Sequence, residues 1–191
     1  MTLPTSRSHR RLLTCVTVLL LLWVGALHGA TTASEDEVRA AFLFQLAQYV
    51  HWPARSAGQE ASPLRFCVLG QDKLTATLVP TVRDKFIEGR SILVLRLASA
   101  KQLPDCDLAF IGFQSEKRIR ATLKSWKYPP ILLVGEADRF AEMGGIVNLV
   151  IRSGRVSFEI NLATGERAHL EFRSQLLRFA RIVSSAPGEK K

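Results

Sequence analysis

The segment IVNLVIRSGRVSFEINL, residues 146–162, indicates which kind of sheet the chain forms. After Gly154 its apolar and polar residues alternate one by one, which is typical of a strand with one buried and one exposed face. The dipeptide Ser153-Gly154 separates this strand from a largely apolar stretch, and a two-residue loop of this type favours a tight hairpin. The segment therefore predicts two antiparallel strands, with Glu159 on the outer face of the second.

Strands and helices alternate in the chain before this hairpin. The first expected helix begins with a capping box, in which Ser34 and Glu37 each satisfy a backbone N–H of the other, and Pro80 is expected to break the second helix. Alternation of this kind predicts a largely parallel sheet with helices on its faces. The fold class is thus α/β: a single-domain sandwich with a mixed, mostly parallel sheet, flanking helices and a C-terminal β-hairpin. The expected elements are residues 34–50, 64–69, 72–86, 90–97, 107–111, 115–126 and 131–137.

The chain after the hairpin is expected to be helical. Residues 162–169 predict a short helix, and residues 174–183 predict a last amphipathic helix. The tail that follows, residues 184–191, is polar and charged and is expected to be disordered.

The N-terminal segment has the pattern of a secretory signal peptide. A basic lead without acidic residues precedes an uncharged apolar run at residues 12–27, and small residues follow. That run is shorter than the roughly 20 apolar residues that a membrane-spanning helix needs, so export is favoured over a retained anchor. Cleavage after Ala30 or Ala33 fits the pattern. The sequence thus predicts a signal peptide at residues 1–33 and an exported domain at residues 34–183.

Export leaves two of the three cysteines, Cys67 and Cys106. An even pair in an oxidising compartment favours one disulfide bond over the alternative, two buried free thiols. The net charge of +9 for the whole chain is spread along the sequence, without interleaved aromatic residues. A solvated basic surface is therefore expected, and no nucleic-acid partner.

The motifs of catalysis and of cofactor binding are missing from the sequence. The chain contains no G-x-S-x-G and no phosphate-binding glycine loop. The exported part has two histidines, His51 and His169, without the spacing of a zinc site. His51 is better explained as a helix-end residue beside a packed indole than as a general base. Glu159 and Glu171 could form an acid–base pair for sugar hydrolysis, but nothing in the sequence fixes their separation. We therefore predict no catalytic residue, no metal and no cofactor.

Several stretches, in this order, resemble the YfiR-like (YfiR/HmsC) family of periplasmic proteins. They extend from about residue 38 to residue 183, and the phrase around Glu159 and the helix after it is the most specific of them. The matching stretches are AAFLFQLAQYVHWP, LRFCVLG, GRSILVLRL, CDLAFIG, the two glycines before IVNLVIRSGRVSFEINL, and SQLLRFARIV.

The resemblance implies a regulator without enzyme activity. Such a protein binds the periplasmic sensor region of an inner-membrane diguanylate cyclase and represses cyclic di-GMP synthesis, which limits biofilm formation. An outer-membrane lipoprotein can sequester the repressor and relieve this effect. Cys67 and Cys106 match a cysteine pair of the family, but the second pair of some relatives is absent from residues 141–148. A redox switch built on that second bridge is therefore not expected here.

The partner-binding surface is expected around Glu159. Leu162, Phe172 and Leu177 add apolar groups near the same edge, and an apolar centre with a charged rim is typical of an interface. In the alternative, these three side chains seal the core beneath the last helix. Two other functions stay open, a periplasmic small-molecule-binding protein and a carbohydrate-active hydrolase. The oligomeric state is open as well, a homodimer included.

Overall fold

The computed structural model describes residues 33–53, 62–152 and 155–185. The unit that contains the fold begins at Ser34. The predicted signal peptide, apart from Ala33, lies outside the described residues, and so do the predicted hairpin turn at Ser153-Gly154 and most of the predicted tail. In the first part of that tail, the hydroxyl of Ser185 accepts a hydrogen bond from Asn161 at 3.0 Å.

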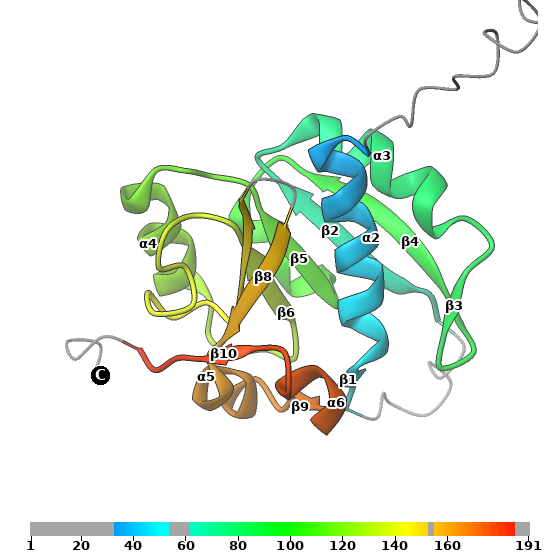
Figure 1. The fold of residues 1–191 in the computed structure, drawn as a ribbon. Coiled ribbons are helices and arrows are strands. Elements are labelled where there is room, and N and C mark those ends of the chain that lie inside the picture. Colours follow the sequence, from blue (N-terminus) through cyan, green and yellow to red (C-terminus); the bar gives the residue numbers. More distant parts are fainter. Residues whose placement is uncertain (1–32, 54–61, 153–154, 186–191) are drawn as a thin grey trace, which may run out of the picture. The chain divides into compact units, whose positions relative to one another are not determined.

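Helices and strands alternate along the first two thirds of the domain, and short elements follow (Figure 1). In chain order they are α2 (Glu35–Gln48), β1 (Val50–His51), β2 (Leu64–Leu69), α3 (Asp72–Val82), β3 (Phe86–Ile87), β4 (Arg90–Leu97), the 3-10 helix η2 (Ala100–Asp105), β5 (Leu108–Ile111), α4 (Glu116–Ser125), β6 (Leu132–Gly135), β7 (Val147–Arg152), β8 (Arg155–Ile160), α5 (Leu162–Arg167), β9 (Glu171–Phe172), α6 (Ser174–Leu177) and β10 (Arg181–Ile182).

Within the described residues the main sheet has eight strands in the order β10-β8-β7-β6-β5-β2-β4-β3. Strands β4, β2, β5, β6 and β7 are parallel, while β8 runs antiparallel to β7 and β3 runs antiparallel to β4. Every residue of β5 and of β6 is buried, as expected for central parallel strands covered on both faces. Arg152 pairs with Arg155 on either side of the predicted turn. The predicted fold class is confirmed.

Helices cover both faces of this sheet. Helices α2 and α3 pack against each other on one face, and α4 lies on the opposite face (Figure 1). The predicted capping box of α2 is present, because Ser34 Oγ accepts from the Glu37 amide at 3.3 Å and the Glu37 carboxylate accepts from the Ser34 amide at 2.6 Å. Buried alanine, leucine and phenylalanine side chains of α2 supply one wall of the core.

Three local predictions differ from the structure. Pro80 lies inside the last turn of α3 and does not break it, and the helix ends at Val82 instead of residue 86. The chain then forms a hairpin around Glu88 and Gly89, whose φ angles of 50° and 76° suit a tight two-residue turn. The predicted helix at 174–183 is wrong beyond Leu177, where a turn at residues 178–180 follows and the chain then adds β10 to the sheet.

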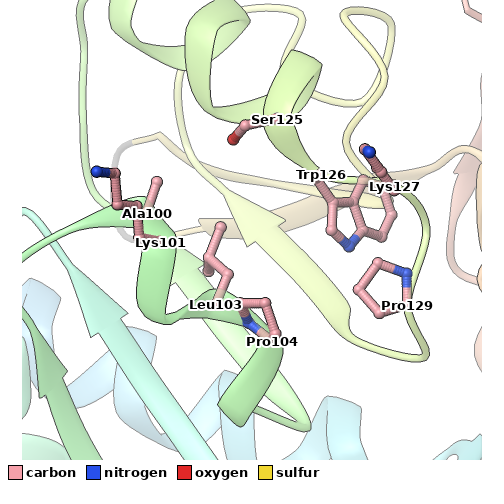
Figure 2. A pocket seen from close by; sticks show the side chains of 8 residues that line it. All are labelled: Ala100, Lys101, Leu103, Pro104, Ser125, Trp126, Lys127 and Pro129. Atoms are coloured by element: carbon pink, nitrogen blue, oxygen red, sulfur yellow. The ribbon is translucent and has the colours of Figure 1, made fainter.

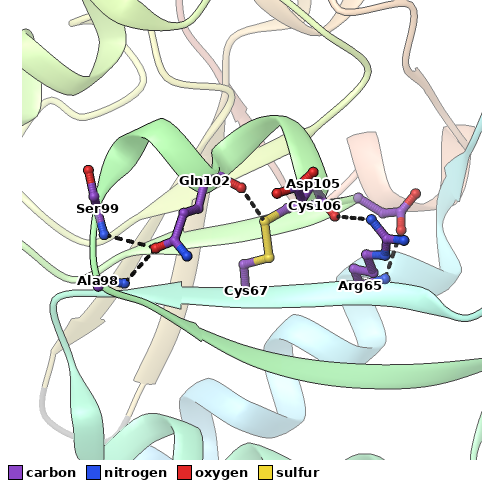
Figure 3. The surroundings of a disulfide bond; sticks show 8 residues. Arg65, Cys67, Ala98, Ser99, Gln102, Asp105 and Cys106 are labelled. Carbon is purple, nitrogen blue, oxygen red and sulfur yellow. Dashed lines mark hydrogen bonds between the residues drawn. A yellow bond between two sulfur atoms is a disulfide. The ribbon is translucent and has the colours of Figure 1, made fainter.

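The predicted disulfide bond is present between Cys67 in β2 and Cys106 at the end of η2 (Figure 3). The two Cα atoms lie 6.0 Å apart, within the range that a disulfide spans without backbone distortion. Beside it, the Arg65 amide donates to the Asp107 carboxylate at 2.7 Å, and the Arg65 guanidinium donates to the carbonyl of Asp105 at 3.1 Å. The bridge therefore fixes η2 and the start of β5 to the middle of the sheet.

Candidate partner-binding surface

The elements after β8 gather at one end of the domain, where α5, β9, α6 and β10 surround the end of β8 (Figure 1). Asn161 organises this region, and its side chain is fully buried. Its Oδ1 accepts from the Thr164 amide at 3.1 Å and so caps α5. Its Nδ2 donates to the Ala141 carbonyl at 2.9 Å and to the Ser185 hydroxyl. One buried amide thus joins three separate segments of the chain.

Glu159 is buried, contrary to the prediction that it lies on an exposed outer face. Only 9% of the residue is exposed. Its carboxylate accepts from Asn148 Nδ2 on β7 at 3.1 Å and from the guanidinium of Arg181 on β10. The hydrogen bond to Glu159 raises the pKa of Arg181. The alternating pattern correctly places Glu159 on the face of β8 opposite to Phe158 and Ile160. That face is not open to solvent at Glu159, because Asn148 of β7 and Arg181 of β10 bind the carboxylate there.

The three apolar residues predicted beside Glu159 are half-buried and pack against the core. Leu162 begins α5, Phe172 lies in β9 and Leu177 ends α6. The ring of Phe172 lies over Gly165, where an added Cβ atom would come within 2.7 Å of it. This packing agrees with the alternative in which these side chains seal the core. Their role in partner binding, like that of Glu159, stays a prediction.

The most exposed apolar residue of this region is Phe179, which the sequence did not indicate as a surface residue. Phe179, between α6 and β10, is 80% exposed, and Ile182 in β10 is exposed as well. Arg178 and Arg181 lie beside them in the chain. The stretch RFARIV has apolar residues at helical spacing, so the sequence favoured a helix with these side chains buried. The structure instead has a turn at residues 178–180 before β10, and Phe179 faces solvent there.

The outer edge of β8 is partly open. Strand β10 pairs only with Glu159 and Ile160. In the part of the chain that the structure describes, no strand pairs with this edge at residues 155–158, and Val156 is exposed there. An unpaired strand edge can accept an extended segment of another protein. We call Val156, Phe179, Arg181 and Ile182 the β8–β10 edge.

The other candidate residues do not form a reactive site. Glu159 lies in the main sheet, whereas Glu171 lies in β9, which pairs with β1 in a separate two-stranded sheet. His51 Nδ1 is 3.6 Å from a carboxylate oxygen of Glu88, and Trp52 packs against the core. Over the described ranges, no three histidine, cysteine or acidic side chains are grouped so that they could hold a metal ion.

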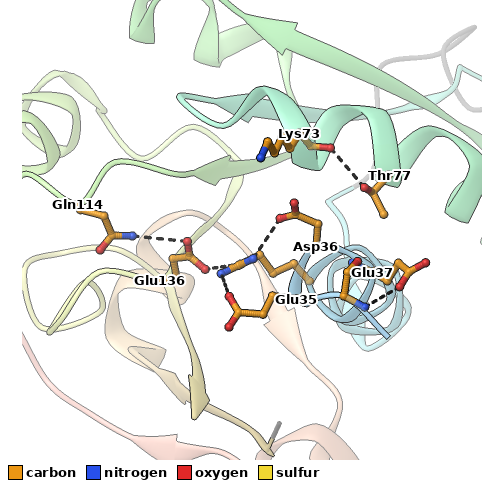
Figure 4. Close-up of polar contacts among 9 residues, drawn as sticks. Glu35, Asp36, Glu37, Lys73, Thr77, Gln114 and Glu136 are labelled. Atoms are coloured by element: carbon orange, nitrogen blue, oxygen red, sulfur yellow. Dashed lines mark hydrogen bonds and ion pairs between the residues drawn. The ribbon is translucent and has the colours of Figure 1, made fainter. Parts of the chain in front are cut away.

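A polar cluster joins the start of α2 to the loop after β6 (Figure 4). The Arg39 guanidinium bonds Glu136 at 2.6 Å, Asp36 at 3.0 Å and Glu35 at 2.9 Å. Burial alone would lower the pKa of Arg39, but the hydrogen bonds and charges of these carboxylates outweigh it and raise that pKa. Each of the three guanidinium nitrogens donates to a different carboxylate, so this cluster braces the fold.

Among the described helices, none is both long and apolar enough to cross a bilayer. One similar solved structure is an ABC domain from Streptococcus pneumoniae in complex with L-Trp, at 11% identity and a TM-score of 0.47. The match covers 75% of this chain and 62% of that one, so the chain spans less than two thirds of that structure. The family model DUF4154, described as YfiR/HmsC-like, matches residues 36–181. This chain, whose ordered sequence motifs resemble that family over nearly the same residues, belongs to the YfiR/HmsC-like family.

Proposed function

We propose that this protein is a periplasmic repressor that binds the sensor region of an inner-membrane diguanylate cyclase and lowers cyclic di-GMP synthesis. The family match over residues 36–181 carries the proposal. YfiR/HmsC-like proteins are periplasmic regulators of diguanylate cyclase signalling that act through a protein partner. Sequestration by an outer-membrane lipoprotein relieves the repression.

The repression works through binding equilibria. A protein that binds the inactive conformation of the cyclase more tightly than the active one shifts the population toward the inactive state. The size of the shift is limited by the difference between the two affinities. A lipoprotein that competes for the repressor lowers its free concentration, and the cyclase returns to its active conformation.

The β8–β10 edge is the surface that we assign to the cyclase. Phe179 supplies an exposed aromatic group and Ile182 an aliphatic one, and Arg181 places a cation next to them. Exposed aromatic residues with arginine beside them are enriched in protein interfaces. In this arrangement Glu159 does not contact the partner, and its carboxylate positions Arg181. The side chains of Leu162, Phe172 and Leu177 pack against the core and support the elements that carry the edge.

The test compares two exposed phenylalanines at opposite ends of the main sheet. Phe179→Ala removes the centre of the β8–β10 edge, and we expect affinity for the periplasmic domain of the cyclase to fall by about tenfold or more, as for an interface hot spot. Phe86 in β3 is 62% exposed, and Phe86→Ala serves as the matched control with unchanged affinity. Isothermal titration calorimetry with purified proteins measures both.

Two results would contradict different parts of the proposal. Equal affinity of the Phe179→Ala and wild-type proteins would remove the β8–β10 edge from the interface and leave the repressor role intact. A cyclic di-GMP level that stays unchanged when the gene is deleted, measured by mass spectrometry of cell extracts, would contradict the repressor role itself.

A further inference from the structure

A cavity of about 520 Å³ lies between η2 and the end of α4 (Figure 2), and its lining includes no residue of the β8–β10 edge. Its volume is in the range of sites that hold small organic molecules. The walls come from two segments, residues 100–104 and residues 125–129. The lining is mainly apolar and includes no acidic residue: Ala100, Lys101, Leu103, Pro104, Ser125, Trp126, Lys127 and Pro129.

The indole N–H of Trp126 is an unsatisfied donor in this cavity. Trp126 is only 5% exposed, and its Nε1 has no hydrogen-bond partner. Figure 2 shows the indole across the cavity from Leu103, with its nitrogen on the side that faces Pro104 and Pro129. Buried N–H groups in folded proteins are nearly always paired. A molecule in the cavity that carries an acceptor oxygen would therefore satisfy this donor.

Two cations stand at the rim. Lys101 on η2 and Lys127 after α4 are exposed and lie on opposite sides of the cavity (Figure 2). Neither ammonium group forms an ion pair with another described residue. An apolar interior with positive charge at its mouth and no acidic side chain favours a ligand that is itself apolar with one negative charge.

Both walls are held in place before any ligand binds. Ser99 and Gln102 form a capping box at the start of η2, and Cys106 ties the end of η2 to β2 through the disulfide bond (Figure 3). On the other wall, the ring of Trp126 packs on Tyr128 with centroids 4.8 Å apart, and Arg167 lies 4.5 Å from the Tyr128 centroid. A preformed site loses little conformational entropy on binding.

We infer that the cavity between η2 and α4 is a binding site for a small organic monoanion with an apolar body, whose carboxylate accepts the Trp126 N–H within the positive potential of Lys101 and Lys127. The apolar body packs against Leu103 on the opposite wall. This site is separate from the proposed cyclase surface, and its occupancy can be measured without any protein partner.

Binding is tested with probes of matched size and different charge. Decanoate represents an aliphatic acid and 2-naphthoate an aromatic one, and 2-naphthamide and 2-naphthylmethylamine are the neutral and cationic counterparts. We expect at least one carboxylate to bind at least tenfold more tightly than the neutral and cationic probes. In ¹H–¹⁵N spectra of the purified protein, the indole N–H signal of Trp126 should move on binding, while that of Trp52 should stay in place.

Variants separate a built site from unspecific binding. Trp126→Phe keeps an aromatic ring but removes the donor, and we expect several-fold weaker binding. The exposed pair Lys101→Glu/Lys127→Glu should weaken carboxylate binding at least tenfold and improve binding of the amine. Lys73→Glu/Lys117→Glu changes the net charge by the same amount outside the cavity, and its affinities should match the wild type.

Two outcomes would overturn the inference. In the first, no carboxylate probe moves the Trp126 signal at millimolar concentration. In the second, both double-lysine variants change carboxylate affinity by the same factor, so that the effect comes from net charge alone. The lysine positions are exposed, so the substitutions test charge at the rim without disturbing the core.

Discussion

Arg39 is the residue whose contacts show most directly how single side chains stabilise the domain. Its side chain and that of Glu136 are each 12% exposed, and they lie far apart in the sequence. A nearly buried ion pair of this kind adds to stability only while both partners are present, since removal of one leaves an unpaired buried charge. Arginine is charged throughout the pH range of a folded protein, and the carboxylates around Arg39 raise its pKa further.

Arg39→Met should therefore lower the free energy of unfolding by about 1–3 kcal/mol, because Glu136 loses its main partner. Urea denaturation followed by circular dichroism measures this value. Arg120→Met is the control, since Arg120 pairs with Glu116 on the exposed side of α4 and such a pair contributes less than about 1 kcal/mol. Equal losses in the two variants would contradict the role given to the Arg39 cluster.

At the scale of elements, the strands of the parallel core could be predicted because their signal is local. Residues 64–69 and 90–97 are bounded by turns and rich in branched apolar side chains, and the structure has them as β2 and β4 with the same limits. The even pair of cysteines in the part predicted to be exported likewise sufficed to predict the disulfide. The proposed partner-binding edge could not be found in this way, because β10 is a strand only through its contacts with β8.

Strand β10 depends on tertiary contacts from a distant part of the sequence. The Val183 amide donates to the Ile160 carbonyl at 2.9 Å, and Arg181 reaches the buried Glu159. Local propensity predicts a helix for these residues, and pairing with an open sheet edge overrides it. The same contacts explain why Phe179 faces solvent, a position that no local pattern in the sequence could indicate.

Glu159→Gln should loosen β10 without unfolding the domain. The substitution keeps the size of the side chain but removes the charge that holds Arg181. We expect the Val183 amide to exchange with solvent about tenfold faster, because a short edge strand opens locally. Hydrogen–deuterium exchange by NMR measures this rate, and Glu171→Gln on the exposed strand β9 is the control. Unchanged exchange at Val183 would show that Glu159 does not secure β10.

At the scale of the whole molecule, the disulfide bond and the proposed partner edge lie in different parts of one sheet. Strands β5, β6 and β7 separate β2, which carries Cys67, from β8. One wall of the cavity, η2, lies on the disulfide side of this division, because Cys106 directly follows η2. Loss of the disulfide bond should therefore alter the position of η2 in the cavity wall and leave the structure of the β8–β10 edge unchanged.

The paired variant Cys67→Ala/Cys106→Ala tests this division. Loss of the bridge should lower the free energy of unfolding by about 2–4 kcal/mol, because the unfolded chain regains the freedom of a long loop. Affinity for the carboxylate probe should fall several-fold as the end of η2 is released, whereas affinity for the cyclase domain should stay within about twofold, since distant sites act nearly independently. Calorimetry below the unfolding temperature measures both affinities. A fall in cyclase affinity well beyond about twofold would contradict the independence of the bridge and the β8–β10 edge. Unchanged affinity would assign the bridge a structural role only.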